Sequence, residues 1–195
     1  QCCLVGSEMC IRDRFYSILE DFKFTPGGRI MHGAGREDIT TTLNNCYVVG
    51  INDDSINSIY KTIQEEARTY KFGGGCGHDL SVLRPSGDAI NGTGGESCGP
   101  VGFMNLFSEN TNTIAQHGRR GANMQTLSID HPDIEKFIEI KTGDVNMVKY
   151  SNISVLLTDE FMSAVSKNEE FDLKYQGKVY KTVNAKELWD KIIDH

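Results

Sequence analysis

The 195-residue sequence lacks the features of a membrane protein, a secreted protein or a zinc protein. No apolar run approaches the roughly 20 residues that a helix needs to cross a bilayer, and the first residues do not have the order of a signal peptide. The six cysteines form no CxxC pair and no HxxxH pattern is present, so a structural zinc site is not predicted. We therefore expect a reducing, cytoplasmic location, where any disulfide would be transient and catalytic.

Positive charge is also scarce. The formal net charge of −7 argues against a broad surface for DNA or RNA, although a small phosphate site remains compatible with it. Hydrophobic residues make up 38% of the chain and charged residues 24%, which is typical of a globular protein. The length suffices for one sizeable domain with its own core.

Residues 1–14 carry three cysteines among mixed polar residues, with no helical or strand period. The run from Cys3 to Asp13 resembles translated sequencing-adapter read-through. We expect residues 1–14 to be a non-native leader, with a frayed N-terminus as the alternative. Cys2, Cys3 and Cys10 are therefore left out of the chemistry, and residues 15–195 are treated as one domain.

From Phe15 onward, helical and strand-like patterns alternate, which predicts an α/β architecture. A helix from Ser55 is expected to stop at Gly73. The other expected helices are 15–22, 101–116, a helix after residues 130–133, one capped by Thr158 or Asp159, and 185–195. Extended segments are expected at 43–51, 80–84, 124–129 and 152–157, with a hairpin at 171–180 around Gly177. Loops are expected at 29–35, 73–77, 85–100 and 117–122.

Cys46 opens a β-branched, strand-like run. A cysteine in such a run is most often a small buried hydrophobe. Its position at the strand start, beside Asn44 and Asn45 and between two glycine-rich loops, instead favours a redox-active thiol that faces a nucleotide.

Two other segments could contact a ligand. Gly73-Gly74-Gly75-Cys76-Gly77 follows a helix, so it is neither a dinucleotide fingerprint nor a P-loop. It has more glycine than a helix cap needs, which favours close backbone approach to a ligand. Arg119 and Arg120 suit phosphate or base edges, or else belong to a solvated loop. Cys76 and Cys98 are interpreted as free thiols, with a disulfide as the alternative.

Ten short motifs occur in an order that resembles the catalytic subunit of ribonucleotide reductases, most of all the adenosylcobalamin-dependent class II branch. The resemblance runs from about Phe15 to the end of the sequence. The motifs are residues 24–30, 45–48, 54–56, 73–75, 83–85, 92–95, 99–101, 119–122, 131–134 and 152–155.

The resemblance implies a ten-stranded α/β barrel made of two antiparallel five-stranded halves, of which this chain holds part of the first. It implies reduction of the ribose 2′-hydroxyl of ribonucleotides by thiyl-radical chemistry, with Cys46 as the first member of a redox-active cysteine pair. Adenosylcobalamin would serve as cofactor in the full-length enzyme, and a thioredoxin- or glutaredoxin-type protein as reductant. The thiyl cysteine, the second cysteine of the pair and the main phosphate loop would lie beyond His195, so the fragment alone is expected to be inactive.

The resemblance also implies roles for single residues. Substrate contacts fall on Arg29, Asn45, Cys46, Gly74 and Gly75. Contacts to a dNTP or ATP effector fall on Asp54, Ser55, Ile56 and Arg84. Residues 85–99 match a first specificity loop and residues 116–124 a second, with Gln116, Arg119 and Arg120. Helices near 55–70 and 101–116 would form a homodimer interface.

Two alternatives remain open. One is a class I catalytic subunit that relies on a separate metal-radical subunit. The other is a nucleotide-binding regulatory module without catalysis.

Overall fold

The computed structural model describes residues 2–92, 94–116, 119–142 and 147–195. The chain divides into two compact units, Gln1–Asn45 and Cys46–His195, and each is described by itself. Within the described residues, no helix is both long and apolar enough to cross a membrane.

The first unit consists of helix α1 (Cys2–Leu19), the 3-10 turn η1 (Glu20–Phe22) and the short helix α2 (Gly28–Gly33). Two expectations fail here. Residues 2–14, expected to lack regular structure, are helical, and most of the expected loop 29–35 forms α2. Residues 11–22 are exposed, so this part of the unit has no buried stripe that the sequence could signal. The non-native origin of residues 1–14 stays a prediction.

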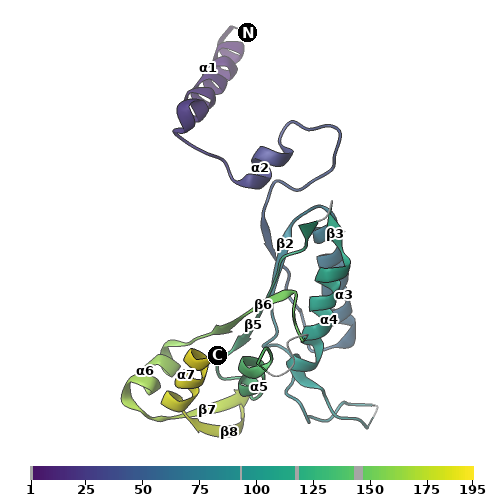
Figure 1. Ribbon diagram of the computed structural model, residues 1–195, viewed down its shortest axis with the longest axis vertical. Coiled ribbons are helices and arrows are strands. Elements are labelled where there is room, and N and C mark those ends of the chain that lie inside the picture. Colours follow the sequence, from purple (N-terminus) through teal and green to yellow (C-terminus); the bar gives the residue numbers. More distant parts are fainter. Residues whose placement is uncertain (1, 93, 117–118, 143–146) are drawn as a thin grey trace. The chain divides into compact units, whose positions relative to one another are not determined.

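The second unit is built on a four-stranded parallel sheet (Figure 1). Its strands are β1 (Cys46–Val48), β2 (Gly75–Asp79), β5 (Asn123–Ser128) and β6 (Ser151–Leu156), in the order β1-β2-β5-β6. Parallel neighbours require a crossover connection, and helices supply most of them. This arrangement agrees with the predicted α/β architecture.

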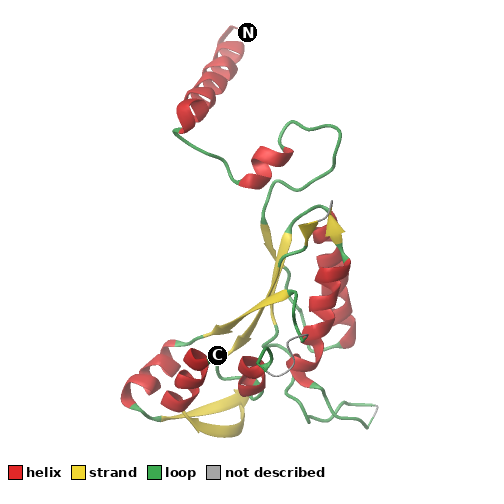
Figure 2. Cartoon of the chain, in the orientation of Figure 1, coloured by secondary structure: helices red, strands yellow, loops and turns green. Residues whose placement is uncertain are grey.

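Five helices accompany the sheet, and Figure 2 shows them in red. They are α3 (Ile56–Lys71), α4 (Gly99–Thr113), α5 (Ile134–Glu139), α6 (Asp159–Lys167) and α7 (Ala185–Asp194). Two small antiparallel pairs complete the unit. They are β3 (Ala115–Gln116) with β4 (Arg119–Arg120), and β7 (Glu170–Tyr175) with β8 (Lys178–Asn184).

Side-chain caps set the starts of the helices that the sequence predicts best. Ser55 Oγ accepts a hydrogen bond from the Ser58 amide at 3.2 Å, and Thr158 Oγ1 accepts one from the Phe161 amide at 3.2 Å. Helix α3 ends just before Gly73, whose φ of +84° favours glycine. The predicted bounds of this helix are confirmed.

The strand predictions need four corrections. The end of the expected helix 101–116 holds β3 instead, and the expected loop 117–122 contains β4. Residues 75–77, expected as part of a loop, belong to β2, while residues 80–84, expected as extended, lie outside any strand, with a turn at residues 81–82. The predicted strand 43–51 is shorter, Cys46–Val48. Glycine-rich β2 has no strand-like sequence pattern; it is a strand because it pairs with both β1 and β5.

The main core fills the space between the sheet, the helices and the β7–β8 hairpin. Fully buried side chains in it include Leu80, Phe107, Leu127, Phe137 and Phe161. Burying each such side chain contributes on the order of 1.5–3 kcal/mol. This core therefore fixes the ends of the strands that carry the candidate site.

Candidate functional site

The sheet has one open face and one face covered by helices. Its more exposed side chains alternate with more buried ones along β5 and β6. The open face carries Cys46, Val48, Met124 and Asn152, and Val48 is 93% exposed. Near the strand starts, Cys46, Gly75, Ala122 and Asn152 help line a cavity of about 320 Å³. This cavity can hold a small ligand against the Cys46 thiol.

Two cysteines lie on adjacent strands but differ in environment. Cys46 is exposed, whereas Cys76 is buried. Cys76 pairs with Tyr47, the neighbour of Cys46, so the two thiols belong to opposite faces of the sheet. Burial raises the pKa of Cys76 to about 11, which leaves it protonated near neutral pH. Cys46 is therefore the thiol of this pair that a solute can reach.

The covered face holds a polar network that the sequence reasoning missed. The Glu66 carboxyl accepts hydrogen bonds from Asn123 Nδ2 at 2.8 Å, Asn110 Nδ2 at 3.2 Å and the Tyr70 hydroxyl at 3.2 Å. His78 Nδ1 lies 3.0 Å from Glu66 Oε1, close enough for an ion pair but without hydrogen-bond geometry. Glu66 and Asn123 are both buried, so this network joins α3, α4, β2 and β5 in the interior.

One signal for the network was present in the sequence. Glu66 stands seven residues after Ile59 and four before Tyr70, on the same side of the helix as both. A carboxyl group on the apolar side of an amphipathic helix indicates a buried polar partner. The identity of that partner required the tertiary structure.

Packing accounts for two of the glycines. A Cβ at Gly74 would lie 2.7 Å from Thr69 Cγ2 and 2.8 Å from Tyr47 Cε2. A Cβ at Gly121 would lie 3.0 Å from the Tyr70 ring. Close approach of neighbouring side chains is thus a sufficient reason for glycine at both positions, and the predicted substrate contact at Gly74 and Gly75 stays a prediction.

The four residues predicted to contact an effector come together at the start of α3. Ser55 caps the helix, and the exposed Ile56 begins it. Arg84 Nε donates to Asp54 Oδ2 at 2.5 Å, and Arg84 Nη1 donates to the Ala89 carbonyl at 3.0 Å. The bond to Asp54 raises the pKa of the Arg84 guanidinium. A helix N-terminus beside a guanidinium can bind an anionic group.

The loop after Arg84 is anchored to the start of α5. Asp133 is buried and accepts hydrogen bonds from the Ser86 amide at 2.7 Å and the Ser86 hydroxyl at 2.6 Å. His131 Nδ1 accepts the Asp133 amide at 3.1 Å, so its Nε2 must donate to the Leu83 carbonyl at 2.9 Å. These contacts hold residues 83–86 in place against the core.

Several predicted residues are not brought together with the others. Arg29 and Asn45 belong to the first unit, whose placement relative to the sheet is undetermined. Gln116 lies in β3, and Arg119 and Arg120 lie in β4, but their side chains are outside the described part of the structure. His117 and Gly118 are outside it altogether.

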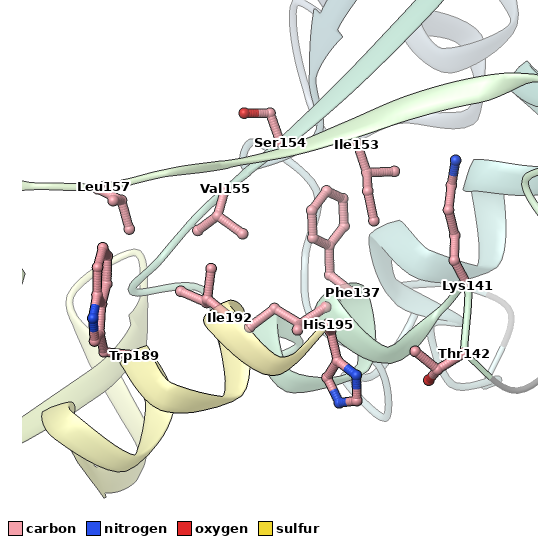
Figure 3. A pocket seen from close by; sticks show the side chains of 11 residues that line it. Phe137, Lys141, Thr142, Ile153, Ser154, Val155, Leu157, Trp189, Ile192 and His195 are labelled. Carbon is pink, nitrogen blue, oxygen red and sulfur yellow. The ribbon is translucent and has the colours of Figure 1, made fainter.

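A second cavity of about 420 Å³ lies between β6, α5 and α7. Figure 3 shows Ile153 and Val155 pointing into it beside Phe137 and Ile192, while Ser154 points to the other side of the strand. Its lining is mainly apolar and holds no cysteine and no Asp or Glu side chain, although Lys141, Thr142 and His195 contribute polar groups. Ile153 and Val155 belong to the covered face of the sheet, so this cavity lies on the opposite face from the Cys46 thiol.

The fold and the site together define a class of protein, a segment of an α/β barrel with a reachable thiol on the open face of its parallel sheet. The comparisons with known proteins identify the family. Residues 44–195 match the family model described as "Ribonucleotide reductase, barrel domain". The chain therefore belongs to the ribonucleotide reductase family, and the expected partial α/β barrel is confirmed.

Two curated relatives share the name vitamin B12-dependent ribonucleoside-diphosphate reductase. The protein from Thermoplasma acidophilum is 37% identical over 185 residues, which cover 93% of this chain and 24% of the relative. The protein from Mycobacterium tuberculosis is 35% identical over 190 residues, which cover 96% of this chain and 27% of the relative. The chain spans about a quarter of the length of these relatives.

A solved structure supports the fold. The class Id ribonucleotide reductase alpha subunit of Actinobacillus ureae matches with a TM-score of 0.74 and 24% identity, covering 93% of this chain and 30% of that one. At this level of identity the likeness shows the fold alone.

Proposed function

We propose that this sequence is part of a vitamin B12-dependent ribonucleotide reductase, which converts ribonucleotides to deoxyribonucleotides with Cys46 as one of its two reducing thiols. The observation that carries the proposal is the exposed Cys46 thiol beside a cavity on the open face of the sheet. The names of the two curated relatives support the choice of the B12-dependent branch.

The proposed reaction balances with a dithiol as reductant. The ribose C2′–OH bond breaks, its oxygen leaves as water, and a C2′–H bond replaces it. Two thiols close to a disulfide and supply the two electrons. Cys46 is one thiol, and the second is expected outside this sequence, which has no cysteine after Cys98. A thioredoxin- or glutaredoxin-type protein would reopen the disulfide.

The residues of this chain would bind and orient the substrate. Gly75 and Gly77 lack side chains, so the floor of the cavity is backbone that a ribose can approach closely. Met124 on β5 and Asn152 on β6 line the same cavity, with the glycines of β2 between them and Cys46. Arg29, Asn45 and Gly74 remain proposed substrate contacts. Binding in this cavity would place the ribose next to the Cys46 thiol, so that the reaction between them becomes effectively intramolecular.

Adenosylcobalamin, when bound, would supply the radical that side chains alone cannot generate. Among the described residues, no three His, Cys, Asp or Glu side chains gather into a metal site. We therefore assign no residue of this chain to the cofactor and derive no step through it.

Allosteric control is the second part of the proposal. The start of α3, with Asp54, Ser55 and Ile56, and the Arg84 guanidinium would bind a dNTP or ATP effector. Gln116, Arg119 and Arg120 would relay effector identity to substrate choice. The partly exposed sides of α3 and α4 would form a homodimer interface. The ion pair of Arg84 with Asp54 supports this because it pre-orients the guanidinium at a helix N-terminus.

The proposed reaction is tested by replacing Cys46 with serine in the full-length enzyme. Serine keeps the size of the side chain but cannot form the disulfide, so reduction of ribonucleotides with a dithiol should be lost. Cys98→Ser, assayed without effector because Cys98 lies in the expected first specificity loop, is the matched control for loss of an exposed free thiol in the second unit. Normal reduction by Cys46→Ser would overturn the redox role and favour a regulatory module.

A class I subunit is the alternative within the same family. A relative from Chlamydia muridarum, named ribonucleoside-diphosphate reductase subunit alpha, is 28% identical over 212 residues. The two branches differ in what starts the radical. Activity of the full-length enzyme with adenosylcobalamin alone would support the B12-dependent branch, whereas activity only with a separate metal-radical subunit would support class I.

A further inference from the structure

The β7–β8 hairpin contacts the segment that carries Arg84 at two points. The Tyr175 hydroxyl donates to the Val82 carbonyl at 2.7 Å, and the Tyr180 hydroxyl donates to Asp88 Oδ2 at 2.6 Å. Val82 stands two residues before Arg84 and Asp88 four residues after it. The two tyrosines therefore bracket the arginine.

The second contact reaches both arms of the loop. The Ser97 amide donates to the Asp88 carbonyl at 2.7 Å, and the Gly87 amide donates to the Ser97 carbonyl at 2.9 Å. Ala89 and Glu96 form a β-bridge next to them. A hydrogen bond to the Asp88 side chain thus holds the base of the loop where its two arms pair.

The hairpin itself is firmly attached to the core. Phe171 and Leu173 on β7 are buried in the main cluster, and the Phe161 ring lies 5.1 Å from that of Phe171. Lys181 on β8 pairs with Glu135 on α5, and the Lys174 amide donates to the Asp130 carbonyl at 2.6 Å. Because the hairpin is packed against the core, its hydrogen bonds can hold the loop in a fixed position.

The Arg84 guanidinium is itself held by two acceptors. Asp54 and the Ala89 carbonyl accept its hydrogen bonds, so the loop backbone and the start of α3 must keep a fixed separation. A guanidinium binds an anionic ligand well only when its planar fork is held in place. The hydrogen bonds at Val82 and Asp88 fix the backbone from which this side chain extends.

We propose that Tyr175 and Tyr180 are positioning residues for the effector site, with the β7–β8 hairpin as the support that holds the Arg84 loop in its binding conformation. The proposal rests on the effector role of Arg84 proposed above. Neither tyrosine needs to touch the nucleotide. Their loss should weaken effector binding, while reduction of ribonucleotides without effector stays unchanged.

The test compares dTTP binding by equilibrium dialysis with effector-free turnover in the full-length enzyme. Tyr180→Phe removes only the hydroxyl, and we expect dTTP to bind at least about tenfold more weakly, the low end of the effect of one hydrogen bond to a charged group. Tyr175→Phe should weaken binding about threefold, because its acceptor is a neutral carbonyl. Thr182→Val is the matched control, since it also removes one hydroxyl from β8, and that hydroxyl donates to Asp172 on the other strand of the hairpin.

A double-mutant cycle tests the contact itself. Asp88→Ala should match Tyr180→Phe, and the double variant should be no worse than Asp88→Ala alone. Asp88→Asn, which keeps a neutral acceptor oxygen, should weaken dTTP binding less than Asp88→Ala does. Additive losses, or a change below about twofold for both tyrosine variants, would overturn the positioning role. Arg84→Ala separates the two proposals: dTTP binding unaffected by it would overturn the effector site, and the positioning role with it.

Discussion

The two faces of the parallel sheet differ in how their polar groups are satisfied. On the covered face, Glu66, Tyr70 and Asn123 hydrogen-bond one another in the interior. On the open face, Cys46 and Asn152 are exposed beside a cavity. The polar groups of the covered face are bonded to one another, whereas the thiol and the amide of the open face remain accessible to a ligand. Because side chains alternate between the two faces of a strand, one short sheet can pack against the core on one face and bind a ligand on the other.

The two cysteines show how far this separation goes. Cys46 and Cys76 lie on neighbouring strands, one register position apart, yet one is exposed and the other is buried. Whether a thiol on this sheet can react with a solute therefore depends on the face that carries it.

The largest expected effect is on the open face. Cys46→Ser should lower reduction of ribonucleotides by on the order of 10³-fold or more, equivalent to about 4 kcal/mol in the activation barrier. The melting temperature should change little, because the side chain is exposed. The rate of reduction is measured as turnover with a dithiol reductant, and the melting temperature by thermal unfolding. A drop in melting temperature as large as that of a core variant would contradict the assignment of Cys46 to the open face.

The matching change on the covered face should destabilise the fold. Glu66→Ala removes one of the two acceptors of each of the Asn110 and Asn123 side-chain amides, and we expect a loss of about 3 kcal/mol in the free energy of unfolding. Glu65→Ala is the control, since Glu65 is the adjacent residue but lies partly exposed on α3. Urea unfolding of both variants measures the two losses in stability. Equal unfolding midpoints would mean that the Glu66 network does not stabilise the fold.

Alkylation should distinguish the two thiols directly. Because the pKa of Cys76 is about 11, its thiolate fraction at pH 8 is about 10⁻³, and iodoacetamide should label it roughly 100-fold more slowly than a free cysteine peptide. Burial should slow it further, while Cys46 should be labelled readily. Peptide mass spectrometry over a time course checks this, and equal labelling of both positions would contradict the two-face arrangement.

The smallest expected effect is a pH dependence at the loop anchor. Burial lowers the pKa of His131, although Asp133, Asp130 and Asp79 oppose this. Below the ordinary pKa of about 6.5 the unfolded chain binds a proton that the folded chain does not, so stability should fall as the pH drops through that value. The slope can reach about 1.4 kcal/mol per pH unit. Melting temperatures from pH 7.5 to 5.5 should show a flatter profile for His131→Asn.

Local patterns predicted the elements whose signals lie within one segment. The amphipathic stripe and the Ser55 cap predicted α3, and Thr158 and Gly177 predicted the α6 cap and the β7–β8 turn. The order of the motifs also predicted the family, and it brought Asp54 and Arg84 into one site although they are 30 residues apart. These features could be predicted because turn, cap and periodicity rules act over a few residues.

The strand β2 and the Glu66 network could not be predicted in the same way. Glycines 75 and 77 carry no strand signal, and they form a strand only because β1 and β5 supply hydrogen bonds on both sides. Glu66 finds Asn123 across 57 residues of sequence. The links from Tyr175 and Tyr180 to the Arg84 loop span more than 90 residues and follow no local rule.

The sequence by itself determined the α/β class, the main helices, the family and the cysteine on which the proposed chemistry depends. Only the tertiary structure decided that Cys46 is exposed and Cys76 buried, and that a hairpin near the end of the chain supports the loop of Arg84. The physical reason is that burial and long-range hydrogen bonds are properties of packed surfaces. They arise only when strands and helices distant in sequence meet.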